Sequence, residues 1–156
     1  MLKNIDRTKK ISFSDLLIKS ICIFALLLYL YCVLYITLID RTVGMRRHVF
    51  RPLWEVSSMF RSGNYRYWSG QIGCNIIMLM PLGFLLPVLS ERFRSIKVIA
   101  AAGFTFSVLI ELTQYYTGRG LFESDDIIHN TIGAVLGCMM FMIISFISGI
   151  NQDNKE

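Results

Sequence analysis

The sequence predicts an all-α, polytopic membrane protein built as a four-helix transmembrane bundle, and three observations support this fold class. Hydrophobic residues make up 54% of the 156-residue chain, and the mean hydropathy is +0.52. Charged residues make up only 17%, whereas soluble domains carry about 25%. The hydrophobic residues also gather in four stretches, each close to the roughly 20 residues that an α-helix needs to cross a bilayer. Together these observations favour a membrane protein over a soluble domain.

The four predicted spans are almost free of charged residues. Only Glu111, in the third span, is acidic or basic, and polar His129 and Asn130 lie near the start of the fourth. The first span exceeds the roughly 7–15-residue hydrophobic core of a cleavable signal peptide, so we expect it to be retained as a helix. The spans cover residues 20–39, 72–90, 98–116 and 127–150.

The loop between the first and second spans combines six arginines with a short amphipathic stretch. Residues 52–60 have hydrophobic side chains near helical spacing and include Trp54. Tryptophan favours the level of the lipid head groups, and amphipathic helices lie in the plane of the membrane interface. We therefore expect a short interfacial helix in this first outer loop.

The distribution of basic residues favours one orientation in the membrane. Four spans place both termini on one side, which carries nine lysines and arginines against seven on the other. The basic N-terminal tail precedes the first span, and the short turn at residues 91–97 is basic as well. Because positive charge favours the cytoplasmic side, we expect a multi-pass protein of the cell membrane, with both termini cytoplasmic and membrane lipids as partners.

Polar residues concentrate at the end of the bundle opposite the termini. Glu111 and Gln114 lie three residues apart and Asp126 and Asn130 four apart, so each pair shares one helix face. A charge in hydrocarbon costs at least about 2.5–3.5 kcal/mol, so we expect Glu111 to face the bundle interior or a water-filled crevice. The predicted functional polar cluster consists of Arg46, Asn75, Glu111, Gln114, Arg119, Asp126 and Asn130.

The same polar residues also allow a purely structural interpretation. Polar contacts between transmembrane helices contribute about 0.6 kcal/mol each on average, and many of them only hold a bundle together. For Asn75, Gln114 and Asn130 both interpretations stay open. For Glu111 the functional one is favoured, because an ionisable group inside a span commonly marks a working site.

The second and fourth spans carry residues that control helix packing. Gly133 and Gly137 form a GxxxG motif, which lets another helix approach closely. Pro81 and Pro87, with Gly83 between them, lie inside the second span, where the two prolines remove backbone donors and should kink the helix. We expect Pro81, Gly83, Gly133 and Gly137 to serve helix packing, and the GxxxG face also suggests a homodimer through Gly133 and Gly137.

Three sequence blocks carry a family resemblance. The first, residues 75–83, reads NxxxxxPxG, and the second, around Glu111, reads IExxQ. The third follows Arg119 and reads DxxxNTxGxxxG over residues 126–137. The order and spacing of these blocks resemble the VanZ-like family of bacterial membrane proteins, with the match covering about residues 46–137.

The resemblance implies a single VanZ-like membrane domain over residues 1–156. Founding members of the family are associated with resistance to the glycopeptide teicoplanin, and no established reaction comes with the family. An RxxNxxPF block that the family carries in the first outer loop is incomplete. Arg46 and Pro52 match it, but Val49 and Leu53 replace the usual Asn and Phe, which puts any role of that Asn in doubt.

These observations lead us to expect a non-enzymatic binding protein. It would engage a lipid-linked cell-wall precursor, or the lipoglycopeptide itself, at the outer leaflet, and so lower susceptibility to teicoplanin-type glycopeptides. Arg46, Arg47 and Arg119 would contact anionic groups of the ligand. Glu111 and Asp126 would orient those arginines or bind a cationic group.

Two other functions stay open. A membrane-embedded enzyme would act on a lipid-linked substrate through Glu111 and Asp126, but the sequence has no nucleophile elbow or HExxH motif, and we assign no catalytic residue. A small proton-coupled transporter would use Glu111, although the chain lacks the internal repeat that transporters often show.

Metal and cofactor sites are not expected. A divalent metal held by Glu123, Asp125 and Asp126 is conceivable, but acidic residues in loops are usually just solvated. The four cysteines form no CxxC pair, so neither a zinc site nor a disulfide framework is indicated. We expect no metal, no cofactor and no nucleic-acid partner.

Overall fold

The computed structural model of the protein describes residues 13–44 and 47–149. Helices dominate this part of the chain, with a π-helical turn after the first helix, a 3-10 turn before α4 and two short strands. In chain order the elements are α1 (Phe13–Leu34), the π-helical turn (Tyr35–Ile39), β1 (Arg47–Val49), α2 (Trp54–Ser62), α3 (Tyr65–Leu89), the 3-10 turn (Glu91–Arg94), α4 (Ile96–Thr117), β2 (Leu121–Glu123) and α5 (Ser124–Ile147).

Four of the helical segments are long and apolar enough to cross a membrane, which confirms the four predicted spans and the all-α class. The second begins at Tyr65 rather than at residue 72, because Asn64 caps it: the Asn64 side chain accepts a hydrogen bond from the Tyr67 N–H at 3.3 Å. The segments cover Leu16–Ile39, Tyr65–Leu89, Ile96–Thr117 and Ser124–Ile147.

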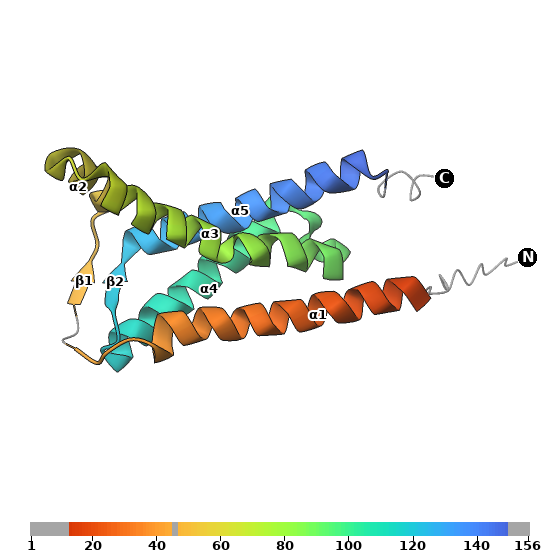
Figure 1. The fold of residues 1–156 in the computed structure, drawn as a ribbon, viewed down its shortest axis with the longest axis horizontal. Helices are drawn as coiled ribbons and strands as arrows, with labels where there is room; N and C mark the ends of the chain where they lie inside the picture. The colour runs from red at the N-terminus through yellow and green to blue at the C-terminus, as the bar shows by residue number, and fades with distance from the viewer. Residues whose placement is uncertain (1–12, 45–46, 150–156) are drawn as a thin grey trace, which may run out of the picture.

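Consecutive spans run in opposite directions, so α3 and α5 run parallel to each other, and α5 is the central helix. It contacts α3 and α4, whereas α1 lies along the side of the bundle and contacts α3. The start of α1 and the end of α5 lie at one end of the bundle, and both strands and α2 lie at the other (Figure 1). Large hydrophobic side chains of α1, such as Phe24 and Leu27, are exposed, as expected for a helix that faces lipid.

Glycines bring the backbones of α3 and α5 into direct contact. A Cβ atom at Gly133 would lie 1.9 Å from the carbonyl oxygen of Ile76, and one at Gly137 would lie 2.0 Å from that of Met80. Gly83 of α3 meets the backbone of α5 in the same way. The close approach predicted from the GxxxG motif therefore occurs within the chain. The homodimer expected through the same glycines stays untested.

Helix α3 continues through both of its prolines. Pro81 and Pro87 lie inside a single α-helix that ends at Leu89. Pro81 lies two residues before Gly83, which touches α5, and its predicted packing role stays a prediction. The kink that we expected at these prolines stays a prediction.

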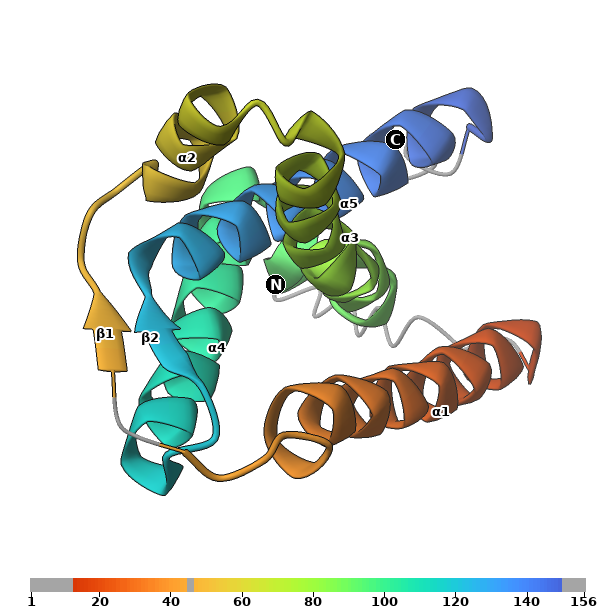
Figure 2. The same cartoon turned by 60° about the vertical axis from the view of Figure 1, so that its left-hand side comes forward.

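Two short strands were not predicted from the sequence. β1 pairs in parallel with β2, with Arg47 opposite Leu121 and Val49 opposite Glu123. Strands of three residues are too short to show a hydrophobic alternation. Their pairing attaches the first loop to the segment between α4 and α5, although the two are far apart in the sequence (Figure 2).

Helix α2 confirms the helix predicted in the first loop, and α5 holds its start in place. The carboxylate of Asp125 accepts hydrogen bonds from the N–H groups of Leu53 at 2.5 Å and Glu55 at 2.9 Å. A carboxylate at a helix start satisfies backbone donors that have no partner within the helix. Asp125 therefore fixes the position of Glu55 relative to α5.

The contact between α3 and α5 leads to a stability prediction. Gly133→Ala should destabilise the protein by about 1–3 kcal/mol or more, because the added methyl overlaps the Ile76 carbonyl and the helices must separate. Thermal unfolding of the purified protein in detergent measures the effect. Gly73→Ala is the matched control, since a Cβ there meets nothing within 4 Å. Equal melting temperatures for the two variants would contradict the packing account.

Candidate functional site

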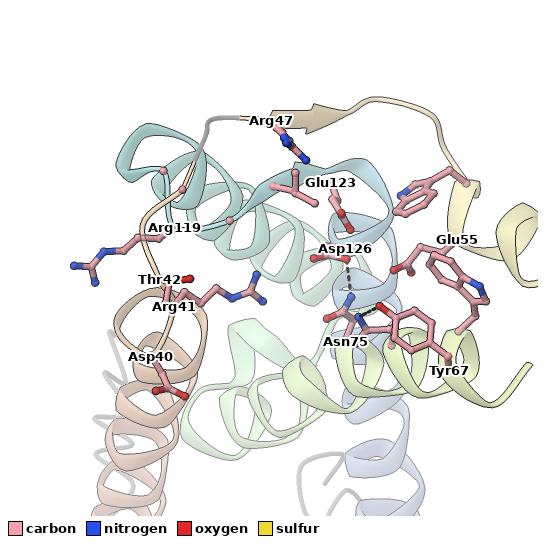
Figure 3. Close-up of a pocket in the computed structure, with 17 residues that line it drawn as sticks. Asp40, Arg41, Thr42, Arg47, Glu55, Tyr67, Asn75, Arg119, Glu123 and Asp126 are labelled. Carbon is pink, nitrogen blue, oxygen red and sulfur yellow. Dashed lines mark hydrogen bonds between the residues drawn. The ribbon is translucent and has the colours of Figure 1, made fainter. Parts of the chain in front are cut away.

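A cavity of about 730 Å³ lies at the end of the bundle that carries the strands. Its walls come from the segment after α1, from α2 and the first half of α3, and from the segment between α4 and α5. Figure 3 shows Glu55, Glu123 and Asp126 close together in this cavity, with Arg41 directed toward Asp126 and Arg47 beside Glu123. We refer to it as the polar cavity.

Three carboxylates form the acidic side of the polar cavity. Glu55 comes from α2, Glu123 from β2 and Asp126 from the first turn of α5. One oxygen atom from each lies within 4.8 Å of the others. Figure 3 shows the three side chains directed toward a common centre. Three separate elements thus deliver acidic groups to one point.

Burial and mutual repulsion make these carboxyl groups harder to ionise. The pKa of Glu55 rises to about 7, because it is buried and because Asp126, Glu123 and Asp125 are negatively charged neighbours. The pKa of Glu123 also rises to about 7, mainly through burial and the charge of Asp126, and the nearby Arg41 partly opposes this rise. The acidic side therefore keeps its protons up to a higher pH than free carboxyl groups do.

Asp126 connects this cluster to the helices beneath it. The Nδ2 atom of Asn75 donates a hydrogen bond to Oδ1 of Asp126 at 2.6 Å, which joins α3 to α5. The carboxyl group of Glu111 lies close to that of Asp126. Glu111 in turn accepts a hydrogen bond from the Glu123 N–H at 2.9 Å. The carboxylate predicted inside the third span therefore supports the cavity floor from below.

Glu55 makes a second buried contact with α5. Its Oε2 atom lies 3.3 Å from Nδ1 of His129, and the two residues are only 3% and 4% exposed. Among the described residues, neither of these two atoms has a hydrogen-bond partner. His129, which the sequence marked only as a polar residue of the fourth span, thus stands directly behind the acidic cluster.

The basic side of the polar cavity is formed by Arg41, Arg47 and Arg119. Figure 3 shows Arg41 directed toward Asp126, while Arg47 enters the same space from β1. Arg119 donates a hydrogen bond from Nη1 to the carbonyl oxygen of Leu38 at 2.8 Å. Arg119 is therefore oriented toward the end of α1, and Arg41 faces the acids instead.

Aromatic residues form a third wall. Trp54 of α2 and Trp68 of α3 meet edge to face with ring centroids 5.3 Å apart, and Tyr67 packs on Trp68 at 5.1 Å. All three line the polar cavity. Trp54, expected at the level of the lipid head groups, thus also contributes to the cavity wall. Flat aromatic faces beside charged groups are suited to ligands that combine an apolar surface with polar substituents.

The remaining predicted site residues are not found among the described residues that line the polar cavity. Gln114 donates a hydrogen bond to the Thr37 carbonyl oxygen at 2.9 Å, and Asn130 donates one to Oγ of Ser107 at 2.8 Å. Both are buried contacts between elements, and neither residue lines the polar cavity. Arg46 lies outside the described residues.

Sequence reasoning placed Asn75, Asp126 and Arg119 on the polar cavity but missed Glu55 and Arg41. Glu55 is one of two acidic residues in an otherwise basic loop, and its position inside the amphipathic stretch was the available signal. Arg41 is one of six arginines in that loop, and nothing in the sequence separates it from the others.

Comparison with known proteins identifies one family. The family described as VanZ/LLP1 matches residues 23–145, which include every element of the polar cavity. No curated protein and no solved structure matches the chain.

The raised carboxyl pKa values predict how stability depends on pH. For Glu55 and Glu123 the folded-state pKa is about 7, above the ordinary value of 4.5. Their contribution to stability is therefore fully present below about pH 4.5 and is lost as the pH rises through about 7. In detergent with a chelator, the melting temperature should fall from pH 5 to pH 8.

The double variant Glu55→Gln/Glu123→Gln should show a smaller fall over the same pH range. Glu91→Gln serves as the control, because Glu91 is exposed and lies outside the polar cavity. The same fall in wild type and double variant would show that these carboxyl groups are not the source of the pH dependence.

Proposed function

The chain belongs to the VanZ/LLP1 family. We propose that it is a membrane protein that binds a lipid-linked cell-wall precursor in the polar cavity. Binding at the outer leaflet lowers susceptibility to teicoplanin-type glycopeptides, because the protein and the drug then compete for the same precursor. The proposal assigns the chain a binding function rather than a catalytic one.

The polar cavity is the observation that carries this proposal. It lies at one end of a bundle of four apolar helices, so a ligand can keep its lipid chain beside the helices while its head group enters the cavity. The volume of about 730 Å³ falls within the common range for small-ligand sites, roughly 300–1,000 Å³.

The residues of the polar cavity fit the chemistry of such a head group. Arg41 and Arg47 supply guanidinium groups, which bind phosphate oxygens in pairs. Trp54, Tyr67 and Trp68 supply aromatic faces on which the apolar face of a sugar ring can pack. Glu55 and Gln71 add groups that accept hydrogen bonds from sugar hydroxyls.

The proposed orientation has both termini in the cytoplasm. The excess of basic residues before α1 and in the turn between α3 and α4 supports this orientation. The polar cavity then opens toward the outer face of the membrane, where cell-wall precursors are polymerised.

An enzyme acting on the same ligand is the alternative, and one contact favours it. The carboxyl groups of Asp126 and Glu111 lie close to each other below the cavity floor. Two carboxyl groups that share a proton are a common arrangement for acid–base catalysis. Turnover of a lipid-linked precursor in reconstituted membranes, lost in Asp126→Asn, would establish this alternative.

The proposed function predicts direct binding of a polyprenyl pyrophosphate to the purified protein. Arg41→Ala should weaken binding by about 10–100-fold, because hydrogen bonds to charged groups contribute about 1.5–3 kcal/mol. Thermophoresis of the labelled protein in detergent measures the dissociation constant. Arg66→Ala is the control, since Arg66 is exposed and lies outside the polar cavity. A folded wild type that does not bind, or equal affinities for the two variants, would refute the proposed site.

A further inference from the structure

The acidic side of the polar cavity has a spacing that suits a metal ion. One oxygen from each of Glu55, Glu123 and Asp126 lies within 4.8 Å of the others. Oxygen ligands sit roughly 2.0–2.6 Å from Mg²⁺ or Ca²⁺, so two ligands on opposite sides of one ion are about 4–5 Å apart. The three carboxylates therefore lie where the ligands of a single cation would lie.

A buried oxygen atom provides a second and independent observation. Oε2 of Glu55 is buried and has no hydrogen-bond partner among the described residues, although the side chain points into the cluster (Figure 3). Buried carboxylate oxygens are stable only when they are paired, hydrogen-bonded or bound to a metal. His129 contacts this oxygen at 3.3 Å without hydrogen-bond geometry, so no hydrogen bond satisfies it.

Each of the three acids is also positioned by a neighbour outside the cluster. Asn75 holds Asp126 through its hydrogen bond at 2.6 Å. Asp125 holds the backbone at Glu55, and Glu111 accepts the Glu123 N–H. Metal sites commonly use such outer contacts to fix the orientation of their ligands. Alone, three adjacent carboxylates would repel one another.

We propose that Glu55, Glu123 and Asp126 form a binding site for a divalent cation of the hard, oxygen-preferring class, such as Mg²⁺, Mn²⁺ or Ca²⁺. The all-carboxylate ligand set excludes a preference for soft, thiolate-loving metals. Three protein ligands leave further positions on the ion for water or for a bound ligand.

The cation resolves a conflict in the charges of the polar cavity. Three carboxylates would repel an anionic head group, although Arg41 and Arg47 would attract it. A divalent ion on the acidic side turns that side into a second attachment point for phosphate oxygens. This bridging role rests on the proposed function, whereas the cation site itself does not.

The chain carries its own reporters for a direct test. Its two tryptophans, Trp54 and Trp68, both line the polar cavity. Tb³⁺ binds carboxylate sites of the Ca²⁺ type and emits light when an adjacent tryptophan is excited. Titration of the full-length protein in detergent with Tb³⁺, excited through tryptophan, should give a saturable signal that Mn²⁺ or Ca²⁺ displaces.

Variants identify the ligands. Glu123→Gln and Asp126→Asn should each weaken Tb³⁺ binding at least about tenfold, the size of effect seen when even outer contacts of metal sites are removed. Asp40→Asn, which alters a carboxylate of the same cavity outside the trio, should leave binding within about twofold. Gel filtration and melting temperature select folded variants. No saturable signal in the wild type, or equal signals in all variants, would overturn the cation site.

A second measurement separates this inference from the proposed function. Binding of a polyprenyl pyrophosphate is compared with chelator and with Mg²⁺ present. If Tb³⁺ does not bind but the pyrophosphate binds equally in both buffers, the cation site is wrong and the proposed function stands. If Tb³⁺ binds in the expected way but the pyrophosphate binds in neither buffer, the cation site stands and the proposed function is wrong.

Discussion

The direct backbone contact between α3 and α5 is the constraint on which the rest of the structure depends. At Gly83, Gly133 and Gly137 the backbones of the two helices touch with no side chain between them, which fixes the relative position and register of the helices. Asn75 lies one residue before the Ile76 carbonyl that touches Gly133, and this places its amide on Asp126. The floor of the polar cavity is therefore a consequence of how tightly two membrane helices pack.

A second constraint follows from placing several carboxylates at the end of an apolar bundle. Removing a carboxylate from water is unfavourable unless donors or cations replace the water. Backbone N–H groups of Glu123 and of the α2 start, together with Asn75, satisfy part of this need. One oxygen from each of Glu55, Glu123 and Asp126 lies within 4.8 Å of the others, so the same arrangement that holds α2 on the bundle also gathers three carboxyl groups at one point.

Hydrophobic length alone predicted the four helices, because each span exceeds the thickness of a bilayer core and its sequence is nearly uncharged. The burial of Glu111 inside the bundle was also predictable, since a charged group in an apolar run requires a specific environment. The positions of Glu55 and Arg41 were not, because they depend on where α2 and the segment after α1 are held by long-range contacts. Asp125 and the β1–β2 pairing supply those contacts, and no local sequence pattern reveals either one. For Arg119 the sequence was misleading. Its position predicted a contact with the acidic residues, but its hydrogen bond goes to the carbonyl oxygen of Leu38.

Teicoplanin susceptibility of a host that carries the protein tests most directly whether the polar cavity is the working site. The comparison needs wild type, Arg41→Ala, the control Arg66→Ala and empty vector, all at matched membrane abundance. We expect wild type and Arg66→Ala to protect the host, whereas Arg41→Ala should behave like the empty vector. Equal protection by Arg41→Ala and wild type would contradict the central role of the polar cavity.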